Sequence, residues 1–247
     1  EIVNLISNKQ NDKAYARLRT LLENNPNPDL YIQAALLASN RKDDISTIIN
    51  YLDKAYNIGT SEQQSRAALI GAMAYADVKD YPKAKQWLAK VVSPSYVFDK
   101  AVFGASLEAE QGNGKAALAE ARRAQSLPEQ EGRYFGSKEL QRVTLFALSK
   151  HDNLKEALSE LNKMLPKISR QPDAMEQLPD VLYQRAMIYD RMGDQGKAIA
   201  DLRRVVELAP DNANGLNALG YILLSPTKKN LDEAFKLIQA AYQIEPE

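Results

Sequence analysis

The stretch PDVLYQRAMIYDRMGDQGKAIADLRRVVELAPDN, residues 179–212, decides the fold of this chain. Its first half predicts a helix over about residues 180–192, because its apolar residues recur at helical spacing and so form a stripe on one face. The residues of this stripe are Leu182, Ala186 and Tyr189. Gly193 and Asp194 follow, where glycine takes a left-handed turn and aspartate caps the next helix.

The second half of the stretch predicts another helix, over about residues 195–208. Its apolar stripe consists of Ala198, Leu202 and Val205. Pro210 ends this helix, because proline has no amide N–H and cannot continue the backbone ladder. Ala186 and Ala198 are small where the two helices cross, and a larger side chain at either position would push the pair apart. The unit is therefore a helix–turn–helix hairpin.

This hairpin resembles the tetratricopeptide repeat (TPR), a helix–turn–helix unit of 34 residues with characteristic residue types at fixed positions. The corresponding positions hold Leu182, Arg185, Ala186, Tyr189, Ala198, Leu202, Val205 and Pro210. Arg185 stands where the family usually has leucine, and Ala186 where it usually has glycine. The second exchange replaces one small residue by another, so the close helix crossing is kept.

Looser copies of the unit run along the whole chain. A residue at the start of each second helix, small in all but one copy, recurs at Ala14, Ile48, Ala84, Ala117, Ala157, Ala198 and Ala234. Successive gaps are 34, 36, 33, 40, 41 and 36 residues, against a family period of 34. The sequence predicts an all-α fold, a right-handed TPR superhelical solenoid of about seven repeats over residues 1–247.

The solenoid is expected to be a single domain and a piece of a longer protein. The first repeat lacks the start of its first helix, and no polar capping helix follows the last repeat, as solenoids normally need for solubility. The weakest joint is expected at residues 167–178, a long connection before the sixth repeat. A lengthened turn is expected at residues 225–230.

Composition excludes several classes of function. The chain of 247 residues has 32 basic and 32 acidic residues, which gives no electrostatic argument for binding nucleic acid or an anionic membrane. It has no cysteine, so it forms no disulfide, and this is compatible with an oxidising or a reducing compartment. No apolar run approaches the roughly 20 residues of a membrane span.

The sequence predicts no enzyme, no cofactor and no metal site. His151 is the sole histidine, and one imidazole without cysteine cannot build a His-based zinc site. We expect it to be a solvated residue in the turn of the fifth repeat. The glycines at 112–114 and 193–196 follow no strand, so they do not fit a phosphate-binding loop. The sequence therefore predicts no catalytic residue.

The TPR resemblance implies a protein or peptide partner, because in that family the first helices line a concave face where partners often bind. The candidate partner-binding residues on that face are Tyr31, Met73, Phe103, Arg142, Phe146, Tyr183, Met187, Asn217 and Tyr221. Leu69 and Val102 are expected beside them. Aromatic and methionine side chains suit a groove for a peptide or partner helix. The alternative is that several of them only pack between adjacent repeats, as expected for Trp87.

A chaperone-tail receptor is not favoured. Some cytosolic TPR co-chaperones clamp a terminal carboxylate with Lys and Asn at fixed inner positions of three neighbouring repeats. Those positions here hold mainly apolar residues, among them Leu69, Met73, Val102 and Phe103. The clamp pattern is therefore not met.

The last two repeats carry a narrower resemblance. Residues 186–223, AMIYDRMGDQGKAIADLRRVVELAPDNANGLNALGYIL, with the lengthened turn before LDEAF, are similar to TPR lipoproteins of the Gram-negative cell envelope. One role in that group is an adaptor that binds a carboxyl-terminal processing protease and brings substrates to it. The resemblance implies a lipid anchor upstream, on the periplasmic side of the outer membrane, and a periplasmic protease as partner.

Two other functions stay open. One alternative is a peptide or lipoprotein chaperone that shields unfolded clients in its groove. The other is a structural subunit that associates with copies of itself through the uncapped ends of the solenoid. The residues do not decide between an envelope and a cytoplasmic location.

Overall fold

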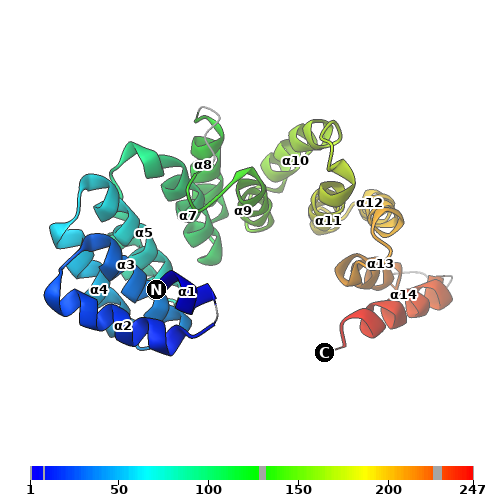
Figure 1. Cartoon of the computed structure of the whole chain (residues 1–247). Helices are drawn as coiled ribbons and strands as arrows, with labels where there is room; N and C mark the ends of the chain where they lie inside the picture. The colour runs from blue at the N-terminus through cyan, green and yellow to red at the C-terminus, as the bar shows by residue number, and fades with distance from the viewer. Residues whose placement is uncertain (1, 8, 128–131, 225–229, 247) are drawn as a thin grey trace. The chain divides into compact units, whose positions relative to one another are not determined.

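The computed structural model describes residues 2–7, 9–127, 132–224 and 230–246, and in these ranges the regular elements are all helices (Figure 1). The all-α fold class is therefore confirmed. The chain forms two compact units, one of Glu1–Gln111 with Ala116–Thr144 and one of Gly112–Lys115 with Leu145–Glu247.

The first unit is built from consecutive helices that pair as hairpins. They are α1 (Ile2–Ser7), α2 (Asn11–Asn24), α3 (Pro28–Asn40), α4 (Ile45–Ile58), α5 (Ser61–Asp77), α6 (Tyr81–Ala89), the short 3-10 helix η1 (Pro94–Tyr96), α7 (Val97–Glu110), most of α8 (Gly114–Gln125) and the first part of α9 (Ser137–Ser149). Helices that are neighbours in sequence pack on one another, as α3 does on α4 and α5 does on α6.

The second unit continues the same pattern. It holds the end of α9 and then α10 (Leu154–Ile168), α11 (Ala174–Arg191), α12 (Gln195–Leu208), α13 (Ala213–Leu224) and α14 (Leu231–Ile244). In this unit α11 packs on α12 and α13 packs on α14. The turn between α11 and α12 follows the sequence prediction, because Gly193 has a φ of +81° and Asp194 accepts a hydrogen bond from the Lys197 amide at 3.2 Å.

The small residues lie at the crossings of the helix pairs. Ala186 and Ala198 are buried in the core that α11, α12, α13 and α14 share. In the first unit the Trp87 ring lies on Gly71, where an added methyl group would come within 2.2 Å of ring atom Cε3. Trp87 therefore packs inside its own α5–α6 hairpin, whereas the sequence predicted packing between repeats.

The connection before the sixth hairpin is shorter than predicted. Helix α10 runs through Pro166 to Ile168, and α11 begins at Ala174 and contains Pro179. The sequence predicted that this helix would begin only at about residue 180. The loss of one backbone hydrogen bond is offset by burial, because Pro179 and Leu182 lie in the hydrophobic interior.

Some expectations on organisation remain predictions. The division into two units falls within α9, between Thr144 and Leu145, and gives no test of a single solenoid with a joint at residues 167–178. Residues 225–229 of the expected long turn lie outside the described residues. Over the described ranges, no helix combines the length and the apolar character needed to cross a membrane.

Candidate functional site

Three of the sequence-predicted binding residues meet in one half-enclosed pocket of about 190 Å³ in the first unit. Met73 comes from α5, Phe103 from α7 and Arg142 from α9, so three successive first helices supply them. We call this site the Met73 pocket. It is lined by Met73, Ala76, Asp77, Val102, Phe103, Ser106, Glu110, Phe135, Glu139, Arg142 and Val143.

The floor of the Met73 pocket is apolar. Val102 and Val143 are buried beneath it, and Met73 and Phe103 are half-buried. The Phe103 ring stacks on Phe135, with ring centroids 6.1 Å apart and planes inclined by 2°. This floor offers contact area to an apolar side chain and no hydrogen bond.

The rim of the Met73 pocket is charged. Its ionisable residues are Asp77, Glu110, Glu139 and Arg142. The Arg142 guanidinium donates to both oxygens of Glu139, through Nη2 at 2.6 Å and Nε at 3.1 Å. This hydrogen bonding holds the pKa of Glu139 below its usual range and raises the pKa of Arg142. Arg142 therefore forms an ion pair with Glu139, a neighbour on its own helix α9.

Phe135 reaches the pocket because residues 132–136, the segment before α9, are fastened to α7. The buried Asp99 carboxylate accepts hydrogen bonds from the amides of Arg133, Tyr134 and Phe135 at 3.0, 2.8 and 2.9 Å. Gly132 passes so close that a methyl group there would lie 2.4 Å from Asp99 Oδ1. Neither Asp99 nor Phe135 was predicted from the sequence. The one signal for them was the gap of 40 residues between the small residues of the fourth and fifth repeats.

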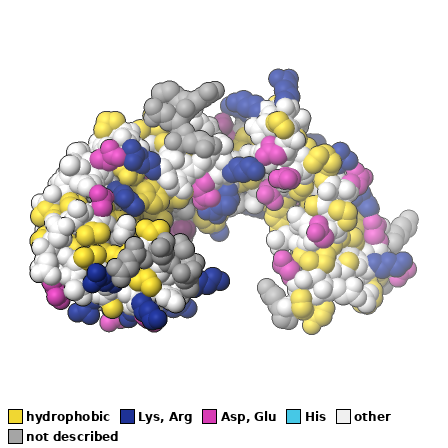
Figure 2. All heavy atoms as spheres, in the orientation of Figure 1, with side chains coloured by type: hydrophobic (Ala, Val, Ile, Leu, Met, Phe, Trp, Pro, Cys, Tyr) yellow, Lys and Arg dark blue, Asp and Glu magenta, His cyan; other side chains and the backbone are white. Residues whose placement is uncertain are grey.

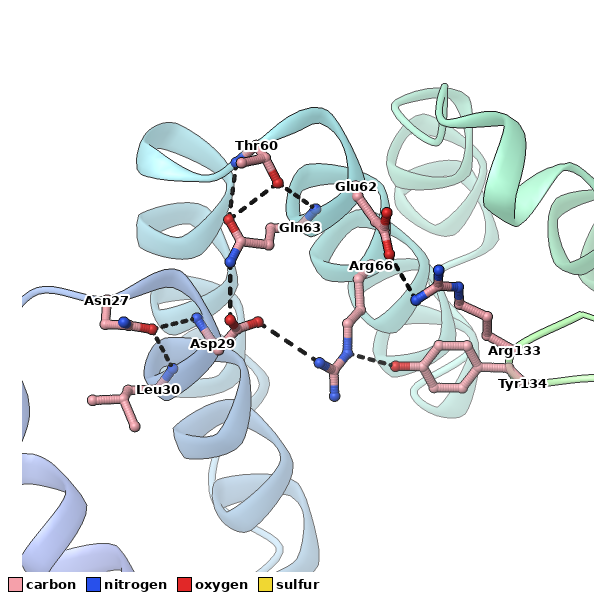
Figure 3. A network of polar contacts seen from close by, with 9 residues as sticks. All are labelled: Asn27, Asp29, Leu30, Thr60, Glu62, Gln63, Arg66, Arg133 and Tyr134. Atoms are coloured by element: carbon pink, nitrogen blue, oxygen red, sulfur yellow. Dashed lines mark hydrogen bonds and ion pairs between the residues drawn. The ribbon is translucent and has the colours of Figure 1, made fainter.

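A second, polar pocket of about 740 Å³ opens in the same unit (Figure 3). We call it the Arg66 pocket. It is lined by Asp29, Thr60, Glu62, Gln63, Arg66, Tyr96, Arg133 and Tyr134. Tyr134 is the neighbour of Phe135 in the fastened segment, so this segment contributes to both pockets.

The charges of the Arg66 pocket are paired with one another. Figure 3 shows Arg66 between Tyr134, whose hydroxyl oxygen accepts from Nε at 3.0 Å, and Asp29, whose Oδ1 lies 3.8 Å from Nη1. Arg133 pairs with Glu62 at 2.6 Å. Two cations and two carboxylates thus balance, and the pocket presents hydrogen-bonding groups without net charge.

Tyr31 lies apart from both pockets. Its ring is 6.4 Å from that of Tyr51 on α4, and the Lys54 amine is 5.8 Å from its centroid. It lines a separate depression of about 270 Å³ with these two residues, Arg19, Leu22 and Glu23. The structure therefore does not bring Tyr31 together with the three residues of the Met73 pocket.

The predicted residues of the second unit divide into two kinds. Tyr183 and Met187 are half-buried and pack against the core of that unit, and burial raises the pKa of Tyr183. Asn217 is exposed and Tyr221 is 70% exposed on α13. Phe146 is half-buried beneath the Lys150 amine, which lies 5.6 Å from its centroid.

Two expected surface residues are buried. Leu69 and Val102 lie in the hydrophobic interior of the first unit. Removing their apolar side chains from water is favourable, and this outweighs a position on the binding face. Of the two, Val102 contributes to the floor of the Met73 pocket. Leu69 does not line that pocket.

His151 is also buried, with 2% of its surface exposed, so the expected solvated turn residue is wrong. The physical reason is the close approach of residues 112–115 to this turn. A methyl group on Gly114 would lie 2.4 Å from the backbone nitrogen of His151. Nδ1 of His151 accepts a hydrogen bond from the Asn153 amide at 3.0 Å, and Nε2 lies 3.6 Å from Glu156. Among the described residues there is no cluster of three or more potential metal ligands.

Comparison with known proteins identifies the repeated hairpin. Residues 179–212 match the family model described as tetratricopeptide repeat. The hairpin of α11 and α12 is a tetratricopeptide repeat. The TPR fold also describes the chain as a whole, since the C-terminal part of a TPR repeat-containing protein from Cytophaga hutchinsonii superposes with a TM-score of 0.71 and 16% identity, over 99% of this chain and 94% of that one.

Two further TPR proteins are similar. YrrB, described as a TPR protein with an unusual peptide-binding site, has a TM-score of 0.58 at 21% identity, over 81% of this chain and 96% of its own. The TPR repeat-containing protein PA4667 of Pseudomonas aeruginosa is 37% identical over 78 residues. Those residues are 30% of this chain and 13% of that protein, so the match spans a small part of the relative. TPR folds generally serve as interaction scaffolds with protein or peptide partners.

Proposed function

We propose that this chain is a non-enzymatic scaffold that binds a segment of another protein at the Met73 pocket. The observation that carries the proposal is the convergence of Met73, Phe103 and Phe135 around a half-enclosed apolar floor with a charged rim. Pockets of this kind, apolar with a few placed polar groups, are the usual sites of recognition. Methionine and aromatic side chains are frequent anchors in protein interfaces.

The neighbouring Arg66 pocket supports an extended ligand. Arg66 and Met73 both lie on α5, seven residues apart in the sequence. A helix rises about 1.5 Å per residue, so their backbones are about 10 Å apart along its axis. About three residues of extended peptide cover that distance. A segment with one side chain in the Met73 pocket can therefore reach the polar groups of the Arg66 pocket with its backbone.

A finer proposal concerns the cellular role. We propose an adaptor of the Gram-negative cell envelope, held by a lipid anchor on the periplasmic side of the outer membrane, that binds a periplasmic processing protease and presents substrates to it. Its support is the similarity of the last two repeats, about residues 179–247, to envelope TPR lipoproteins. A cytoplasmic scaffold is the alternative. A lipoprotein signal in the full-length gene would favour the envelope, and an N-terminus without one would contradict it.

The proposed function is tested by capturing partners from a membrane extract with the immobilised chain. The comparison is between the wild type, Phe103→Ser in the Met73 pocket and Val92→Ser as a matched control. Val92 is exposed between α6 and α7 and lines neither pocket. We expect one folded partner at stoichiometric amount, lost with Phe103→Ser and kept with Val92→Ser. Capture of many unfolded clients would favour the chaperone, and equal capture by both variants would overturn the site.

Self-association is a second candidate, favoured by the outer face of α14. Phe235 and Tyr242 are exposed to 66% and 62%, and they lie seven residues apart, on one face of the helix. Figure 2 shows hydrophobic side chains at the surface of the part of the molecule that contains α13 and α14. Light scattering would show oligomers that grow with concentration and disappear in Phe235→Ser. A concentration-independent monomer would reject this candidate.

A further inference from the structure

We propose that the Met73 pocket selects a partner segment in which an apolar side chain stands next to a lysine or arginine. The apolar side chain enters the pocket and the cation reaches the carboxylates Asp77 and Glu110 on its rim. This inference rests on the proposed function and names the chemical class of the bound segment.

The size of the pocket sets the first requirement. An apolar protein cavity of about 150 Å³ is large enough to hold a benzene molecule. The Met73 pocket has about 190 Å³ and is open on one side. It therefore accommodates one phenylalanine, leucine or methionine side chain and not a longer apolar stretch. The stacked rings of Phe103 and Phe135 offer a flat wall for such a side chain.

The charge of the rim sets the second requirement. The rim has three carboxylates, of Asp77, Glu110 and Glu139, and one guanidinium, of Arg142. Glu139 and Arg142 satisfy each other through their paired hydrogen bonds. The two remaining carboxylates leave the rim negative. A partner carboxylate would meet this negative field, whereas a partner cation would be attracted by it.

Asp77 and Glu110 stand at unusual positions for acidic residues. Asp77 is the last residue of α5 and Glu110 is the last residue of α7. Helix C-termini carry a partial negative charge, so acidic residues there are disfavoured. Asp77 and Glu110 both go against this preference, and both lie on the rim of the same pocket. Local preferences are most often broken at functional sites.

The backbone adds to the same field. The last carbonyl groups of a helix point outward at its C-terminal end and form the negative end of the helix dipole. Helices α5 and α7 both end at the Met73 pocket, with their final side chains on its rim. The carboxylates and the carbonyl groups therefore both attract a cationic side chain of the partner. The apolar side chain next to that cation binds the apolar floor below.

The test uses the whole chain with methionine methyl groups labelled for NMR. The signal of Met73 is assigned by its loss in Met73→Leu. The probes are three capped tripeptides, acetyl-Lys-Phe-Lys-amide, acetyl-Glu-Phe-Glu-amide and acetyl-Lys-Ser-Lys-amide. We expect the Lys-Phe-Lys probe to shift the Met73 signal saturably and to bind at least about tenfold more tightly than Glu-Phe-Glu. We expect Lys-Ser-Lys to leave the signal unmoved.

The double variant Asp77→Asn with Glu110→Gln separates the contribution of the rim charges from that of the apolar floor. It is expected to bind Lys-Phe-Lys and Glu-Phe-Glu with similar affinity, because the apolar floor remains. Its helical content by circular dichroism should be unchanged, since the helix ends lose an unfavourable charge. Asp53→Asn, an exposed carboxylate of α4 outside the pocket, is the matched control and should keep the tenfold preference.

The outcomes distinguish this inference from the proposed function. Equal binding of Lys-Phe-Lys and Glu-Phe-Glu by the wild type, or a preference that survives the double variant, would overturn the inference. The proposed function would still stand if Phe103→Ser abolished capture of the partner from extract. A Met73 signal that no probe moves, together with no captured partner, would overturn both.

Discussion

The Arg185 guanidinium is joined to the Asp201 carboxylate by two hydrogen bonds, Nε to Oδ2 and Nη2 to Oδ1, each of 2.7 Å. Nη1 of the same guanidinium donates to Asn162 Oδ1 at 3.0 Å. Arg185 therefore connects α11 to α12 and α10, at a repeat position where the family usually has leucine. Hydrogen bonding to Asp201 raises the pKa of Arg185. A buried carboxylate on α12 thus accompanies the exchange of leucine for arginine on α11.

Arg185→Leu should destabilise the second unit although it restores the usual residue of the repeat. Asp201 is buried, and removing its partner leaves an uncompensated charge that costs about 3 kcal/mol. Urea unfolding followed by circular dichroism measures the loss. Adding Asp201→Leu to Arg185→Leu should recover most of it, because the remaining charge is gone. A single variant as stable as the wild type would show that the pair contributes nothing.

Asp99→Asn should loosen the segment that carries Tyr134 and Phe135. An amide has one oxygen, so it cannot accept all three backbone N–H groups that the carboxylate accepts, and one of them faces an NH₂ group instead. A buried donor without its acceptor costs about 1–3 kcal/mol. Hydrogen exchange of the amides of residues 133–135 should become faster, while exchange in the middle of α5 stays unchanged. Unchanged exchange at all three amides would contradict the role of Asp99.

Gly71→Ala should destabilise the protein and Gly104→Ala should not, although both place a methyl group on a glycine within a helix. At Gly71 the methyl group meets the Trp87 ring at 2.2 Å, whereas at Gly104 the nearest atom is 3.6 Å away. Overpacking costs about 1–3 kcal/mol, and alanine improves a helix interior by up to about 1 kcal/mol. The thermal unfolding midpoint should fall for Gly71→Ala and hold or rise for Gly104→Ala. Fluorescence of Trp87, the sole tryptophan, should change in Gly71→Ala alone.

Stability should fall as the pH rises from about 10 to about 12. Burial, and then a hydrogen bond with Tyr15, raise the pKa of Tyr51 to about 12, against about 10 in an unfolded chain. The folded state holds this proton more tightly, so its contribution is complete below pH 10 and is lost as the pH passes the folded value. Denaturant midpoints measured across this range should decline less steeply in Tyr51→Phe than in the wild type. Parallel curves would show that Tyr51 does not contribute.

The candidate site was partly predictable. Met73, Phe103 and Arg142 lie on successive first helices, Met73 about one turn later in its repeat than the other two, so the helical spacing read from the sequence was sufficient to place them on one side. Tyr31 was assigned in the same way but belongs to the most degenerate of the hairpins, where the small residue is replaced by Ile48. Its ring packs toward Tyr51 instead.

The sequence by itself determined the paired helices, because helix periodicity, small residues at crossings and turn residues act within one hairpin of about 34 residues. Only the tertiary structure decided that Asp99 holds Phe135, that Gly114 covers His151, and that α11 begins before Pro179. Each of these depends on a contact between segments or on burial that offsets a local penalty. No local pattern specifies the partner in such a contact, so the shape of the Met73 pocket emerged only when the helices were packed.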